Sequence, residues 1–137
     1  MVAGSSISNG NKPARSVAFV HDTNIYGGVE VFLLLLIQHL DPKRYTPVVL
    51  VPGYTDSLRG SPARFIQQVK GLGLPLVNLP VRLEKTGLGL IRQIQKTVQI
   101  FEDLRLDVVH IHTCRPSGAR ISTVSAWLAG IPALLRT

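Results

Sequence analysis

Apolar strand-like runs alternate with helix-like segments along almost the whole chain, and this alternation limits the possible folds more than any other feature. It is typical of βαβ units, in which each helix returns the chain so that the next strand runs parallel to the last. With right-handed crossovers, we predict a doubly wound, Rossmann-like parallel α/β sheet with strand order 3-2-1-4-5. The expected strands are 16–21, 47–51, 76–79, 107–112 and 133–136, and the expected helices are 28–40, 62–72, 90–104 and 117–129.

The segments outside these elements are expected to be loops and a leader. Residues 1–15 are rich in Ser, Gly and Asn and contain no apolar core of signal-peptide length, so we expect a disordered leader before one domain at 16–137. Segment 82–89 is expected to be a loop in which Gly87 and Gly89 suggest mobility. The longest apolar run, residues 31–37, is far shorter than the ~20 residues that span a bilayer. We therefore expect a buried helix there and no membrane anchor.

The charge balance indicates the class of partner. The 137 residues carry a net charge of +7, and the basic residues are scattered. Such an excess favours a phosphorylated substrate or an anionic membrane face. Nucleic acid is not expected, since no basic stripe with interleaved aromatic residues accompanies the charge. The single cysteine is compatible with a reducing, cytoplasmic location.

The predicted strand order places two loops together. Because the sheet reverses direction between the first and fourth strands, ligands are expected outside the carboxyl ends of those strands. Loops 22–29 and 113–118 should therefore face each other across one crevice. Gly27-Gly28, at the entry to the first helix, either forms a tight turn or binds an anion at the helix N-terminus; its place after the first strand favours the anion.

Several common phosphate sites are excluded by missing residues. No G-x-G-x-x-G follows the first strand, and the second strand ends Leu50-Val51-Pro52 without the acidic residue that holds an adenosine ribose. No P-loop motif is present, and Leu79-Pro80 stands where a phosphoacceptor receiver needs an aspartate. Dinucleotide, P-loop and receiver functions are therefore not expected.

The polar residues of the crevice are the candidates for chemistry. Asp22 is either a general base or a loop cap, and Glu30 either lines the crevice or complements the helix dipole. Arg120 is expected to be a solvated side chain. Arg115, in the crevice loop, either contacts an anionic ligand or is a solvated side chain as well. The predicted cleft-wall or acceptor contacts are Asn24, Glu30, His112, Thr113, Arg115 and Ser117.

His110, His112 and Cys114 alternate at the end of the fourth strand, so they would share one face if the strand continued. Three ligands are too few for a closed zinc site, and the strand is expected to bend before Cys114. We therefore predict no metal. His110 is expected to be buried and hydrogen-bonded, and His112 to lie in the crevice, where it and Asp22 are the candidate catalytic residues.

Two segments resemble family 4 glycosyltransferases of the GT-B fold. Residues 17–21, Gly27-Gly28-Val29-Glu30 and residues 40–45 resemble the family's opening, and residues 106–112 with 129–132 resemble its next landmark. The resemblance implies an acceptor-side domain of a retaining enzyme that uses a nucleotide-sugar donor and needs no essential metal or cofactor. It also implies that Gly27 and Gly28 lie against the donor diphosphate and sugar, and that His112 is part of the cleft wall.

The sequence departs from the family pattern at its end. Family members carry a further histidine just beyond the fifth strand and then a donor domain with paired glutamates, and this sequence stops at Thr137. We therefore expect an acceptor-side part that is inactive alone, acting on a glycan, lipid-linked or small-molecule acceptor, with docking to an anionic membrane as one variant. The alternative is a non-catalytic Rossmann-like module that binds a small anionic ligand or a partner protein.

Overall fold

The computed structural model describes residues 13–22, 27–54, 61–81, 86–113 and 119–137. Within them lies a five-stranded parallel sheet in the order β3-β2-β1-β4-β5, which confirms the predicted topology. In chain order the elements are β1 (Arg15–Asp22), α1 (Gly28–Gln38), β2 (Tyr45–Pro52), α2 (Ser61–Gly71), β3 (Leu76–Leu79), α3 (Gly87–Asp103), β4 (Val108–Thr113), α4 (Arg120–Leu128) and β5 (Ala133–Arg136).

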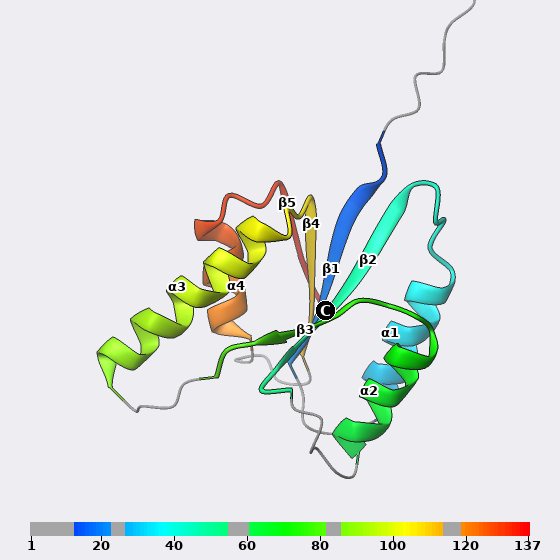
Figure 1. The fold of residues 1–137 in the computed structure, drawn as a ribbon, viewed down its shortest axis with the longest axis horizontal. Coiled ribbons are helices and arrows are strands. Elements are labelled where there is room, and N and C mark those ends of the chain that lie inside the picture. The colour runs from blue at the N-terminus through cyan, green and yellow to red at the C-terminus, as the bar shows by residue number, and fades with distance from the viewer. Residues whose placement is uncertain (1–12, 23–26, 55–60, 82–85, 114–118) are drawn as a thin grey trace, which may run out of the picture.

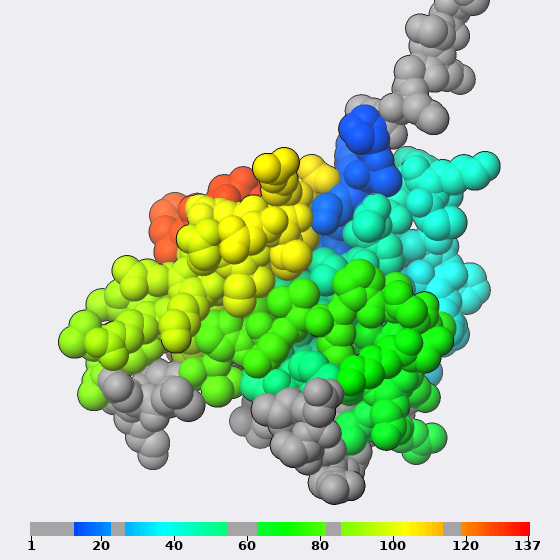
Figure 2. Space-filling view, viewed as in Figure 1, coloured from blue at the N-terminus to red at the C-terminus, as the bar shows by residue number. Residues whose placement is uncertain are grey.

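The helices form one layer on each side of the sheet. Helices α1 and α2 cover one face and α3 and α4 cover the other, as the ribbon shows (Figure 1). Successive residues of β1 point to opposite layers: Val17 and Phe19 pack with α1 and α2, while Ala18 and Val20 belong to the cluster that includes Phe101 of α3. In the space-filling view, α3 (yellow-green) and α2 (green) lie on opposite sides of the molecule (Figure 2).

Helices α3 and α4 each begin three residues away from their predicted start, and α2 begins one residue earlier than predicted. Helix α3 begins at Gly87, so the predicted loop 82–89 is wrong at its end, and Gly87 and Gly89 are helical. The Oγ1 of Thr86 accepts a hydrogen bond from the N–H of Gly89 at 3.1 Å, and this N-cap starts the helix despite its glycines. Helix α4 begins at Arg120, after Ala119 in the left-handed conformation (φ 55°). Residues 82–85, and residues 1–12 of the predicted leader, lie outside the described part of the chain.

The prediction that the first helix is buried holds for only one of its faces. Leu33, Leu34 and Ile37 are buried against the sheet. Three further apolar side chains of α1 are about half exposed, although the ring of one of them, Phe32, also lies near His112 of β4: Val31, Phe32 and Leu35. Among the described residues, no helix combines the length and the apolar character needed to cross a bilayer.

Candidate functional site

The ends of β1 and β4 lie side by side, as expected at the switch point. His21 pairs in register with His112, and Asp22 with Thr113. The two predicted crevice loops, 22–29 and 113–118, therefore start at neighbouring positions of the sheet. The loops themselves, with Asn24, Cys114, Arg115 and Ser117, lie outside the described residues, so the prediction that they face each other stays a prediction.

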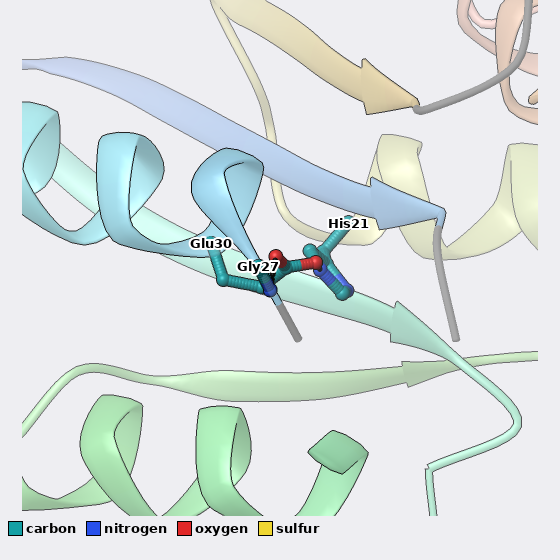
Figure 3. A network of polar contacts seen from close by, with 3 residues as sticks. All are labelled: His21, Gly27 and Glu30. Atoms are coloured by element: carbon teal, nitrogen blue, oxygen red, sulfur yellow. Dashed lines mark hydrogen bonds and ion pairs between the residues drawn. The ribbon is translucent and has the colours of Figure 1, made fainter. Parts of the chain in front are cut away.

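A buried polar network joins the end of β1 to the start of α1 (Figure 3). The Oε1 of Glu30 lies 2.6 Å from Nε2 of His21, and both side chains are buried. The second oxygen, Oε2, accepts a hydrogen bond from the backbone N–H of Gly27. Glu30 is the third residue of α1, where an acidic side chain reaches back to the N-cap backbone as in a capping box. One carboxylate thus connects a strand end to the glycine-rich turn.

The environment of this pair sets its protonation. Burial lowers the pKa of His21, although the hydrogen bond and the charge of Glu30 oppose this. Burial alone would raise the pKa of Glu30, but hydrogen bonds from His21 and from the backbone N–H groups of Glu30 and Gly27 outweigh it and hold the pKa below its usual range. A neutral imidazole therefore donates its Nε2–H to a carboxylate. The His21 ring also stacks on Phe65, with 4.3 Å between ring centroids.

Glu30 was predicted to line the crevice or to complement the helix dipole, and the structure engages both of its oxygens within the chain. Its observed contacts position the strand end and the turn. No role was predicted for His21 from the sequence. The signal was present, because a strand-end histidine is followed nine residues later by a glutamate at the third position of a helix.

Neither glycine of the turn is required by the local backbone. Gly27 has an extended conformation (φ −164°), which any residue adopts. A Cβ on Gly28 would meet no atom within 4 Å, and one on Gly27 would approach only Oε2 of Glu30, at 3.9 Å. The described structure thus gives no steric reason for two adjacent glycines.

His112 is buried and lies beneath aromatic side chains. Its ring is 6.1 Å from Phe32, 6.2 Å from Phe19 and 4.1 Å from His110, between centroids. Its Nδ1 lies 3.1 Å from Oγ1 of Thr137, and its buried Nε2 has no hydrogen-bond partner within the described part of the chain. Burial, with repulsion from His110 and His21, lowers the pKa of His112 to about 4. The imidazole is therefore neutral near pH 7.

The predicted burial of the two β4 histidines needs correction. His110, expected to be buried, is partly exposed and lies 3.3 Å from Oγ1 of Thr137, whereas His112 is the buried one. The reason is position: His110 pairs with Leu135 of the edge strand β5, while His112 lies under α1. The two rings do share one face, as their spacing predicted. Among the described residues, no group of three His, Cys, Asp or Glu side chains is placed to hold a metal ion.

A cavity of about 230 Å³ lies on the α3 and α4 side of the same sheet edge. Its walls come from the carboxyl ends of β1, β2 and β3 and from helices α3 and α4, with Asp22 among them. Arg120, predicted to be a solvated side chain, is exposed but also lines this cavity. Its lining residues are Asp22, Pro52, Leu79, Pro80, Gln93, Thr97, Ala119, Arg120, Ile121 and Ser122.

Comparison with known proteins adds one match. A family model described as Glycosyltransferase Family 4 matches residues 26–135. The match begins just before α1 and ends within β5, so it includes Gly27, Gly28, Glu30 and the β4 histidines. A search of curated proteins finds no match.

Proposed function

Because the chain belongs to glycosyltransferase family 4, we propose that it is the acceptor-side part of an enzyme that transfers a sugar from a nucleotide-sugar donor with retention of anomeric configuration. The donor is a co-substrate, and no resident cofactor or essential metal is needed. The acceptor is a glycan, a lipid-linked glycan or a small hydroxylated molecule. The isolated chain binds ligands at its sheet edge without completing the transfer.

The observation that carries this proposal is the unexplained pair of glycines at the start of α1. Neither Gly27 nor Gly28 is demanded by backbone conformation or by neighbouring atoms. A remaining physical reason for glycine at a helix N-terminus is close approach of a ligand to the backbone. We assign that ligand as the donor diphosphate and its attached sugar, held by a turn that the Glu30 carboxylate fixes in place.

The other predicted site residues take supporting roles. His112 is buried, and a pKa of about 4 makes its neutral ring a weak base, so we assign it to the wall of the cleft and proton transfer to other groups. Thr113 ends β4 next to Asp22, and Asp22 faces the cavity in which an acceptor hydroxyl would approach. Asp22 is the carboxylate best placed to accept a hydrogen bond from that hydroxyl.

We also propose that the chain docks peripherally on the cytoplasmic face of a membrane through α4. Val124, Trp127 and Leu128 are exposed at helical spacing on α4, and Trp127 is 75% exposed. Tryptophan suits the boundary between lipid and water, and a net charge of +7 complements anionic headgroups. This surface would bring the cleft to a lipid-linked acceptor.

The test uses inorganic pyrophosphate as a probe for the diphosphate. In amide NMR spectra of the chain, pyrophosphate should shift the signals of Gly27, Gly28 and Val29, and Gly28→Leu should remove these shifts while the rest of the spectrum stays folded. Gly71→Leu is the matched control, since a Cβ there also meets nothing within 4 Å. In the complete gene product, Gly28→Leu should abolish nucleoside diphosphate release. Unchanged pyrophosphate binding or full transfer by Gly28→Leu contradicts the proposal.

A further inference from the structure

A second cavity lies at the end of the sheet opposite the glycine turn. Its walls come from the end of α1, the start of β2 and the residues that follow α2, and we call it the amino-end groove. Because the strands run parallel, the start of β2 and the ends of β1 and β4 lie at opposite ends of the sheet. The groove has a volume of about 430 Å³, within the 300–1,000 Å³ typical of ligand pockets.

The floor of the amino-end groove is apolar. Six of its eight lining residues are leucine, isoleucine or proline, and only Gln38 and Tyr45 carry polar side-chain groups. Leu40, Tyr45 and Leu74 also pack against the core cluster between the sheet and helices α1 and α2. The apolar core of this layer thus reaches the surface here, and Leu72 at its margin is 40% exposed. Apolar surface in a concave site favours a ligand with an apolar part.

Basic side chains gather at one rim of the groove. The guanidinium of Arg44 lies over the ring of Tyr45, with Cζ 5.6 Å from the ring centroid, so a cation stands against the groove wall. Lys43 and Arg44 are the only adjacent basic residues in the chain, and they directly follow the lining residue Pro42. Arg15 lies beside them, since its backbone N–H donates to the backbone oxygen of Arg44 at 2.8 Å. All three basic side chains are exposed.

The rim keeps a positive charge. Asp41 is the only acidic residue within 38–47, and its Oδ1 accepts a hydrogen bond from the backbone N–H of Lys43 at 2.9 Å. In the described part of the chain, no carboxylate forms an ion pair with Arg15, Lys43 or Arg44. Three cations against one carboxylate leave a net charge of +2 beside an apolar floor. A ligand that matches both features has an anionic head and an apolar tail.

We propose that the amino-end groove binds one single-chain anionic amphiphile, a long-chain fatty acid. Its tail lies on the apolar floor, and its carboxylate meets the guanidinium of Arg44, whose planar donors match a carboxylate. Lys43 and Arg15 add positive charge around this head. The groove is concave, so it suits one acyl chain better than the flat surface of a bilayer. The site does not depend on the proposed function, because it lies at the other end of the sheet from the glycine turn.

The test follows the amide NMR signals of the chain during titration with laurate below its critical micelle concentration. Laurate should shift the amides of Gln38, Tyr45 and Leu74. Octanoate has a shorter tail and buries less apolar surface, so its half-saturating concentration should be at least about tenfold higher. Dodecyltrimethylammonium carries a long tail on a positive head and should shift these amides far less. The proposal is overturned if laurate leaves the amides unshifted, or if dodecyltrimethylammonium binds as well as laurate.

Two variants separate the contribution of the head from that of the tail. Arg44→Gln should raise the half-saturating laurate concentration about fivefold, the equivalent of about 1 kcal/mol for an exposed ion pair. Lys96→Gln, at an exposed position of α3, is its control. Leu72→Ser removes part of the floor and should also weaken laurate binding several-fold, whereas Ile91→Ser, exposed on α3, should not. Equal effects of each variant and its control would overturn the assignment.

Vesicles distinguish a bound fatty acid from a membrane surface. Arg44→Gln and Leu72→Ser should leave co-sedimentation with anionic vesicles within about twofold of wild type, because the proposed membrane contact lies on α4 and not at this groove. If both variants lose vesicle binding and keep laurate binding, the groove and its basic rim form a membrane surface, and the proposal is overturned.

Discussion

The carboxylate of Glu30 lies 2.6 Å from Nε2 of His21, and both side chains are buried where β1 passes into α1. Because the second oxygen of Glu30 accepts from the N–H of Gly27, the pair fixes the glycine turn as well as the strand end. The turn at the proposed donor site is thus held by His21, which precedes residues 23–26, and by Glu30, which follows them.

The first prediction concerns Glu30. Glu30→Ala leaves the buried Nε2–H of His21 and the N–H of the exposed Gly27 without their acceptor, so the free energy of unfolding should fall by about 2 kcal/mol. Glu30→Gln keeps one acceptor oxygen and should lose roughly half as much. Urea denaturation measures both, with Glu102→Ala at an exposed position of α3 as the control. A loss below about 1 kcal/mol in Glu30→Ala would show that the pair does not hold the turn.

The second prediction compares two glycines. Gly28→Ala should leave the free energy of unfolding within about 1 kcal/mol of wild type, because a Cβ there meets nothing and alanine favours helix. Gly53→Ala should lose about 2 kcal/mol, since Gly53 has a φ of +65° and its Cβ would lie 3.0 Å from Cγ1 of Val81. Thermal or urea unfolding measures both. A fall of several kcal/mol in the free energy of unfolding of Gly28→Ala would show that Gly28 is needed for the fold and would contradict its assignment to ligand binding.

The sequence pattern predicted the order of strands and helices because that order follows from where apolar residues recur. It did not reveal the His21–Glu30 pair, because the residue types alone do not show whether a histidine and a glutamate are buried together or separately exposed. It also placed the start of α3 too late, because Gly87 and Gly89 favour a loop locally while the Thr86 cap and the packing of Phe101 select helix. The pattern also did not show which faces of α1 are buried, because an apolar residue type does not tell whether a helix face packs against a neighbour. Three apolar side chains of α1 are exposed: Val31, Phe32 and Leu35.

The third prediction concerns the outer surface of α4. The chain should co-sediment with vesicles that contain anionic phospholipid, and added salt should weaken this binding. Trp127→Ser should reduce it several-fold, because the exposed indole loses its contact with the lipid boundary. Leu35→Ser, exposed on the opposite helix layer, is the matched control and should bind as wild type. If vesicle binding does not depend on salt, on anionic lipid or on Trp127, the proposed docking to a membrane is wrong.

The last prediction is the response of stability to acid. The pKa of His112 falls from 6.5 to about 4 on folding, so between these values the unfolded chain binds more protons than the folded one. The contribution of His112 is therefore complete above pH 6.5 and is lost as the pH falls toward 4, by about 3 kcal/mol in total. Urea denaturation at pH 7.5 and 5.0 should show about 2 kcal/mol of that loss. His112→Leu should flatten the profile by this amount. An unchanged slope in His112→Leu would mean that the buried ring takes up a proton without cost, and His112 would then be available for proton transfer in the cleft.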